Sequence, residues 1–149
     1  MTDENVAATY RERIAVPAAA APVPQPCVDA CASYSFVETR SVPLPPAYNV
    51  GVSFSIPAGK QAVIQFVTAT VQVPAGEWAR LRLYTSIGSS PGNFDLVLTP
   101  QGSPGGQSTY VATHSLKLFT DNLLEFNINR DNGTTSGQAI ICVGGYLLG

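Results

Sequence analysis

The feature that most constrains the fold is a series of short segments in which apolar and polar residues alternate, separated by turn-forming residues. In the clearest of them, Val50–Ile56, every second residue is apolar and the residues between are Gly or Ser. A period of two is that of a half-buried β-strand. Pro57-Ala58-Gly59 then supplies a turn signal. This part of the chain is therefore expected to be built from strands.

Similar runs continue to the end of the chain, and no segment after the first 32 residues has a helical period. We expect strands at Tyr34–Glu38, Val50–Ile56, Gln61–Val73, Trp78–Ile87, Phe94–Leu98, Tyr110–Leu118, Leu123–Asn129 and Ala139–Leu148. About eight strands in a chain of this length favour an all-β fold, an antiparallel two-sheet sandwich. A jelly roll is the first choice and an immunoglobulin-like arrangement the second.

Two local signals refine this prediction. Within Gln61–Val73, the apolar residues change from even positions, Ala62 to Phe66, to odd positions from Val67 onward, which indicates a bulge or a strand that passes between sheets. Asp131-Asn132-Gly133 lies between the last two apolar runs and predicts a hairpin turn between them. We prefer that interpretation to a calcium loop, because the later bidentate glutamate is missing.

The first 32 residues differ in character from the rest. They contain four prolines around the tract Ala18-Ala19-Ala20-Ala21, and proline-rich sequence favours extended polyproline geometry over a packed core. We therefore divide the chain into an extended N-terminal arm, residues 1–32, and a β-sandwich domain, residues 33–149. Fully extended, about 30 residues span on the order of 100 Å. The candidate partner-binding residues of the arm are Tyr10, Ile14, Val16, Pro22 and Pro24.

The composition limits the partners. Only 12% of the residues are charged and the net charge is -2, so no basic field is present to attract nucleic acid. Globular domains usually contain about 25% charged residues. The deficit suggests that part of the surface is buried against other subunits in a dimer or trimer. The alternative is a neutral surface of Ser, Thr, Asn and Gln.

The sequence gives no sign of export or membrane insertion. No apolar run approaches the roughly 20 residues that cross a bilayer, and Met1–Asn5 lacks the basic region that opens a signal peptide. We expect a protein that is made in the cytoplasm and contacts no membrane.

No catalytic or metal-binding set is evident. His114 is the only histidine, and its place in an alternating run favours a partly buried or interface residue over a catalytic base. Cys27 and Cys31 are close enough in sequence to form a disulfide in an oxidising environment. Cys142 lies in an apolar run and is expected to be a buried thiol. We therefore predict no enzyme activity, no cofactor and no metal.

Exposed aromatic residues leave a second interpretation open. Sugar-binding sandwiches use such residues with flanking amides, and Trp78 and Tyr84 are the candidates for a glycan contact. Trp78 stands at the start of a strand, where a tryptophan also packs over the edge of the core. A carbohydrate-binding or receptor-binding, adhesin-like module is therefore the alternative function.

The plan of the chain, an arm through Pro26 followed by the strand series from Val50 to Leu148, resembles that of small jelly-roll phage and viral head decoration, or cement, proteins. The resemblance concerns organisation and carries over no site residue. It implies a non-enzymatic structural protein of the virion, assembled in the host cytoplasm. Such a protein would oligomerise through its sandwich and clamp neighbouring subunits of a larger shell with its arm.

Overall fold

The structure is a computed structural model, and it describes residues 34–149. The arm residues 1–32 lie outside this range, so the predicted boundary between arm and domain remains a prediction. The described chain contains one short 3-10 turn, η1 (Pro104–Gly106), and nine strands. The strands are β1 (Tyr34–Leu44), β2 (Asn49–Ser53), β3 (Gln61–Pro74), β4 (Ala79–Ile87), β5 (Ser90–Leu96), β6 (Thr99–Gly102), β7 (Gln107–Thr120), β8 (Leu124–Arg130) and β9 (Gly137–Leu148).

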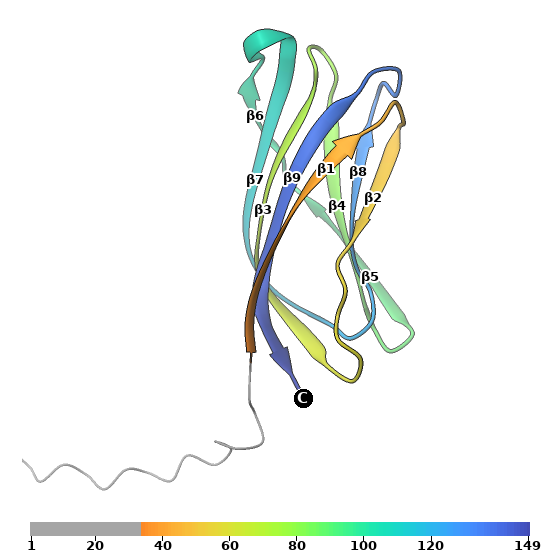
Figure 1. Ribbon diagram of the computed structural model, residues 1–149, viewed down its shortest axis with the longest axis vertical. Coiled ribbons are helices and arrows are strands. Elements are labelled where there is room, and N and C mark those ends of the chain that lie inside the picture. The colour runs from red at the N-terminus through yellow and green to blue at the C-terminus, as the bar shows by residue number, and fades with distance from the viewer. Residues whose placement is uncertain (1–33) are drawn as a thin grey trace, which may run out of the picture.

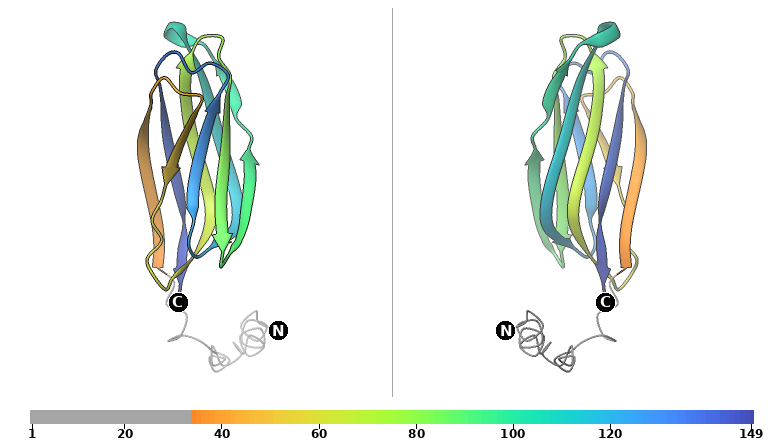
Figure 2. Two further views of the ribbon diagram at one scale, coloured as in Figure 1. Left: turned by 90° about the vertical axis from the view of Figure 1, so that its right-hand side faces the viewer. Right: turned by 90° about the vertical axis from the view of Figure 1, so that its left-hand side faces the viewer.

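The strands form two antiparallel sheets that face each other along the long axis of the body (Figure 1; Figure 2). Sheet A has the order β1-β9-β3-β7-β6, and sheet B has the order β2-β8-β4-β5. The pairs β1/β9, β2/β8, β3/β7 and β4/β5 are nested, as in one long hairpin rolled so that its arms alternate between the sheets. This is the topology of a jelly roll. The predicted antiparallel sandwich is confirmed.

The core lies between the two sheets and comes from the inward-facing half of each strand. In β8 the burial alternates strictly, with Leu124, Phe126 and Ile128 buried and the residues between them half-buried. Phe54 meets Phe126 edge to face, with ring centroids 5.5 Å apart, a geometry that aromatic pairs prefer. The period of two in the sequence is thus the division between the core and the outer face of each sheet.

The predicted irregularity in β3 is present as a bulge around Gln65, where β3 has one extra residue against β9 and β7 has one extra residue against β3. Its pairing with both β7 and β9 shifts register between Ile64 and Phe66. The shift falls before Phe66, which therefore faces outward, contrary to its predicted parity with Ala62 and Ile64. Its ring lies over Gly144, where a Cβ atom would overlap it. The bulge keeps both apolar sets of β3 in the core, because it moves the alternation by one residue.

One predicted strand is in fact two strands in different sheets. The run Phe94–Leu98 was expected to form a single strand, but β5 ends at Leu96 in sheet B and β6 begins at Thr99 in sheet A. Between them Val97 is largely exposed while Leu98 packs against the core. Apolar alternation continues through the crossing, so periodicity did not reveal it.

The predicted hairpin between the last two strands is also wrong. β8 lies in sheet B and β9 in sheet A, so residues 131–136 cross from one sheet to the other. Gly133 lacks the positive φ that a type I′ hairpin turn requires. A Cβ atom at Gly133 would lie 2.8 Å from the backbone of Ala47 and Tyr48. Glycine is present because two connections pass closely there. Asn132 Oδ1 accepts hydrogen bonds from the N–H and the hydroxyl of Thr134 instead.

A buried ion pair lies at the end of the sandwich where these connections meet. Arg130, the last residue of β8, is 3% exposed and Glu77, in the β3–β4 turn, is 5% exposed. Both Nε and Nη2 of Arg130 donate to Glu77 Oε2, at 3.1 and 2.5 Å. Arg130 Nη1 donates to the carbonyl of Thr135, and the Thr135 hydroxyl donates to Glu77 Oε1. The charges are therefore paired and hydrogen-bonded, which is the condition for burying them.

We expect removal of either charge to destabilise the fold strongly. Glu77→Gln should lower the free energy of unfolding by about 3–5 kcal/mol, because it leaves Arg130 buried without a counter-ion. The double variant Glu77→Leu/Arg130→Met should be less destabilised than Glu77→Gln, since it leaves no lone charge. Denaturant unfolding of the unchanged protein, of Glu77→Gln and of the double variant gives the three free energies of unfolding.

The matched control is Glu38→Gln, which breaks an exposed pair with Arg40 whose side chains are 39% and 43% accessible. It should change stability by less than about 1 kcal/mol. An equal decrease in the free energy of unfolding for Glu77→Gln and Glu38→Gln would contradict a structural role for the buried pair.

Candidate interaction surfaces

Several predicted site residues lie outside the part of the chain that the structure describes. These are the candidate arm contacts and the candidate disulfide: Tyr10, Ile14, Val16, Pro22, Pro24, Cys27 and Cys31. The structure therefore neither supports nor opposes them. The surfaces available for comparison are the outer faces of the two sheets and the two ends of the body.

The outer face of sheet A, here called face A, is almost free of charge. Burial and register place polar uncharged and small apolar side chains outward on its four long strands. Its outward residues include Val37, Thr39, Ser41, Thr68, Thr70, Gln72, Thr109, Val111, Thr113, Gln138, Ile140 and Cys142. Within residues 34–149, Lys117 near one end of β7 is the charged residue at an outward position of this sheet.

Face A also carries exposed apolar groups and a shallow hollow at its centre. The hollow has a volume of about 190 Å³ and is lined from β3, β7 and β9, by Thr68, Ala69, Thr70, Val111, Ala112, Thr113, Ile140 and Cys142. Ile140 is 44% exposed. Cys142 is half-buried, so its prediction as a buried thiol is wrong. Ile141 and Val143 occupy the inward positions on either side, and the alternation turns the thiol outward.

The outer face of sheet B, here called face B, has the opposite character. The register aligns amide, hydroxyl and charged residues across its four strands. They are Asn49, Gly51 and Ser53 of β2, Glu125, Asn127 and Asn129 of β8, Arg80, Arg82 and Tyr84 of β4, and Asn93 and Asp95 of β5. The side-chain oxygen of Asn127 is buried without a hydrogen-bond partner in the structure. The charge of the sandwich is thus segregated onto one of its two faces.

Two arginines share one carboxylate on face B. Arg80 donates to both oxygens of Asp95, at 3.0 and 2.5 Å, and Arg82 Nε donates to Asp95 Oδ1 at 2.9 Å. The hydrogen bonds from Arg80 and then Arg82 lower the pKa of Asp95 from 3.8 to about 2. Arg82 also donates to the Tyr84 hydroxyl at 3.3 Å, and this bond and Asp95 raise the pKa of Arg82.

The structure does not bring Trp78 and Tyr84 together. Tyr84 lies within face B, beside Arg82, whereas Trp78 precedes β4 at the end of the body and is 48% exposed. The Trp78 backbone N–H donates to Asp131 Oδ1 at 2.9 Å. Six residues of strand span about 20 Å, so the two aromatic rings do not form one contact surface.

The remaining polar candidates are dispersed. His114 is half-buried, as expected, and its Nε2 lies 3.1 Å from the carbonyl oxygen of Val97. In the described range, no three His, Cys, Asp or Glu residues come together to hold a metal ion. No helix there is long and apolar enough to span a bilayer.

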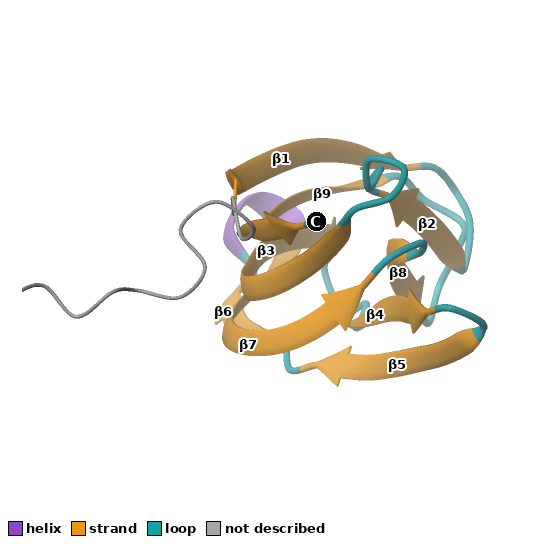
Figure 3. Cartoon of the chain, turned by 90° about the horizontal axis from the view of Figure 1, so that it is seen from below, coloured by secondary structure: helices purple, strands orange, loops and turns teal. Residues whose placement is uncertain are grey.

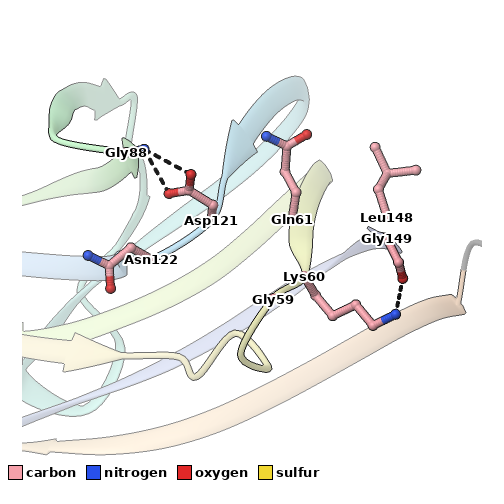
Figure 4. Close-up of a pocket in the computed structure, with 8 residues that line it drawn as sticks. All are labelled: Gly59, Lys60, Gln61, Gly88, Asp121, Asn122, Leu148 and Gly149. Atoms are coloured by element: carbon pink, nitrogen blue, oxygen red, sulfur yellow. Dashed lines mark hydrogen bonds between the residues drawn. The ribbon is translucent and has the colours of Figure 1, made fainter.

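An open polar hollow of about 680 Å³ lies at the end of the body where β9 finishes (Figure 4). Its two charged side chains are already engaged within the chain. Both oxygens of Asp121 accept from the Gly88 N–H, at 3.0 and 2.8 Å, and Lys60 donates to the Gly149 carbonyl. The first contact joins the ends of β4 and β7, in different sheets, and the second joins the ends of the neighbouring strands β3 and β9. We therefore assign the hollow a structural role.

The segregation of charge between the faces was not predicted, although the sequence carries a signal for it. In the predicted strand Trp78–Ile87, Arg80 and Arg82 alternate with Leu81 and Leu83, but the sequence does not show which strands share a sheet. With the nested jelly-roll order, the same parity would have assigned the charged rows to sheet B.

Comparison with known proteins adds little. No protein family model matches the chain, and no curated protein matches it. Among solved structures, a chain described as "Cyanophage Pam1 capsid asymmetric unit" aligns with a TM-score of 0.41 and 19% identity, over 89% of this chain and 98% of the other. A similarity at that level carries no conclusion about function.

The charge cluster of face B makes a prediction about pH. Because the folded pKa of Asp95 lies below its unfolded value, its contacts stabilise the fold above about pH 4, and that contribution is lost as the pH falls towards 2. The difference in unfolding free energy between the protein and Asp95→Asn should therefore shrink over this interval. NMR titration of the Asp95 carboxyl carbon gives the pKa directly. A midpoint at the ordinary value of 3.8 would contradict the bidentate geometry.

Proposed function

We propose that the protein is a non-enzymatic structural component of an assembly, in which two copies associate through face A. The observation that carries the proposal is the segregation of charge: face B has Arg80, Arg82, Asp95 and Glu125, while face A has Lys117 at its margin. A solvent-facing β-surface normally carries charge for solubility. An uncharged sheet face with exposed Ile140 and Val37 has the composition of a surface that is covered.

The dimensions of face A suit an interface between subunits. Four strands spaced about 4.8 Å apart span about 19 Å, and ten residues of strand span about 33 Å. The resulting area of roughly 600 Å², before the relief of the side chains is counted, approaches the 800 Å² or so that each partner buries in a standard interface.

A second copy of the same chain is the partner that face A fits best. In an isologous pair, residue i of one copy contacts residue j of the other and j contacts i, and a residue near the two-fold axis contacts its own copy. A charge near that axis is therefore opposed by the same charge. Face A avoids that repulsion because its central residues, Thr68, Thr70, Ile140 and Cys142, are uncharged. Face B, with two arginines on one strand, does not avoid it.

The finer proposal concerns the host assembly. Jelly rolls serve viral capsid proteins, lectins and cupins, so the topology alone does not select among functions. The arm and the uncharged face together favour a virion decoration or cement protein. It would pair through face A and reach neighbouring subunits of a protein shell with residues 1–32.

The assembly proposal predicts different effects of the same charge on the two faces. Thr70→Glu, in the middle of face A, should shift the solution mass from dimer or trimer towards monomer, because each copy would bring an unpaired carboxylate into the interface. Asn129→Glu is the matched control, since it adds the same charge on face B opposite Arg80. Light scattering of the full-length Thr70→Glu and Asn129→Glu variants gives the solution mass of each. A monomeric parent protein, or equal masses for the two variants, would refute self-association through face A.

Carbohydrate binding remains the second candidate function, and one observation favours face B as its site. The unpartnered oxygen of Asn127 lies one strand from Arg82, and amides and arginine beside the ring of Tyr84 could donate to and stack on a sugar. Glycan binding that is lost with Tyr84→Ala and retained with Trp78→Ala would support it. Loss with neither variant would exclude this face.

A further inference from the structure

Strand β1 is the longest strand at a margin of either sheet. In Figure 3 it lies at the border of sheet A, beside β9. Within residues 34–149, no strand pairs with its other side. The remaining marginal strands, β2, β5 and β6, have five, seven and four residues. β1 therefore presents the longest row of unpaired backbone N–H and C=O groups, which is a template for another strand.

A proline shows which residues of β1 carry these groups. Pro43 pairs with Gln138 in a ladder that covers the whole strand without a register shift. Proline has no N–H to donate, so in a continuous ladder its nitrogen faces the unpaired side. Because backbone groups alternate between the two sides of a strand, the odd-numbered residues face that side together with Pro43. Val37, Thr39 and Ser41 thus present their N–H and C=O groups at the edge.

An ion pair occupies the inward side of β1. Glu38 and Arg40 share the parity of the buried Val42 and Leu44, so they lie at the margin between the sheets. Arg40 Nε and Nη2 donate to Glu38 Oε1, at 2.8 and 2.6 Å, and the guanidinium lies 5.0 Å from the centroid of the Phe54 ring. In the described part of the chain, Arg40 Nη1 and Glu38 Oε2 have no hydrogen-bond partner. The pair is held in place and has capacity for further bonds.

We propose that β1 of a second copy pairs antiparallel with β1 across this edge, about a two-fold axis at Thr39. In this register, Glu38 of each copy lies opposite Arg40 of the other. Even-numbered residues direct their backbone groups to β9, so these are non-hydrogen-bonded pairs, in which side chains come closest. Arg40 Nη1 of each copy donates to Glu38 Oε2 of the other. Two separate ion pairs become one network of four charges without net charge.

The two charges select this register. If the axis lay at either charged residue, like charges would face each other there. An axis two residues to either side of Thr39 would place Arg40 opposite Val42 or Glu38 opposite Phe36, which are both apolar. Inward charges usually protect an edge. Here they exclude the other registers and favour one, which is how specific interfaces combine repulsion with attraction.

The backbone supplies the rest of the contact. Thr39 of each copy exchanges two hydrogen bonds with its counterpart, and Val37 does so with Ser41 of the other copy. Pro43 ends the ladder because it has no N–H. A ladder of this length is a weak contact by itself, but it places the two faces A side by side in one continuous sheet. The inference goes beyond association through face A and does not depend on it.

A cysteine at the axis tests the pairing. Residues opposite each other in a hydrogen-bonded pair have Cα atoms about 5.5 Å apart, which a disulfide can bridge. Under oxidation by diamide, the full-length Thr39→Cys variant should form a 39–39 disulfide between copies, identified by mass spectrometry of the linked peptides. Val37→Cys is the matched control. It should not link to itself, because four residues of offset separate the two positions by about 14 Å, but it should link to Ser41→Cys when these variants are mixed.

Charge reversals in the Thr39→Cys variant test the ion pairs. Glu38→Arg alone and Arg40→Glu alone each bring like charges together, so each should lower the yield of the 39–39 disulfide about tenfold or more. The double change Glu38→Arg/Arg40→Glu should restore the yield. A mixture of the two single variants should restore it as well, because opposite charges then meet between chains. Recovery in the mixture shows that both single variants are folded.

The outcomes that overturn the proposal are specific. A 39–39 disulfide whose yield does not respond to the charges would show random collision or another register. No 39–39 disulfide would mean that the edge of β1 stays unpaired or is covered by another part of the chain. Adding Thr70→Glu should keep the 39–39 disulfide while the solution mass falls. Failure of the edge pairing and failure of association through face A are therefore separate results.

Discussion

The ion pair between Glu77 and Arg130 fixes the end of the sandwich on which the nested topology depends. Three connections and one strand meet there. Besides the pair itself, the Tyr110 hydroxyl donates to the Glu77 carbonyl at 2.8 Å, and the Arg130 N–H donates to the Tyr48 carbonyl at 2.9 Å. The β1–β2, β3–β4 and β8–β9 connections and strand β7 are thus held by the side chains and main chain of these two residues. A jelly roll brings strands distant in sequence together, and this pair specifies how its crossings meet.

With the crossings fixed, the two outer faces acquire different roles. Sheet A presents long central strands with threonine, valine and isoleucine outward, while sheet B presents arginines that share Asp95 beside a row of asparagines. The contrast is compatible with a protein in which the outer face of sheet A contacts a partner and the outer face of sheet B is exposed to solvent. Association through a face and through an arm would reinforce each other, because linked contacts raise each other's effective concentration.

The sequence predicted what depends on local alternation and failed where topology decides. The strands of the sandwich and the irregularity of β3 followed from period two alone, because burial of one side is a local property. The crossing at Val97 and the false hairpin at Gly133 did not, since alternation and turn signals look the same within a sheet and between sheets. Glu77 and Arg130 are 53 residues apart, and each resembles a solvated charge beside a turn. Trp78 and Tyr84 both occupy even positions of the predicted strand Trp78–Ile87. They do not form one site, because β4 begins only at Ala79 and Trp78 lies before it, at the end of the body.

The most direct test of self-association through face A uses its own cysteine. Cys142 faces outward at the centre of that surface, so its rate of alkylation by iodoacetamide reports whether the face is covered. We expect the rate, followed by mass spectrometry of the Cys142 peptide, to fall as the protein concentration rises through the range in which light scattering shows association. A rate that stays constant while the mass increases would mean that the copies associate elsewhere and that face A is open.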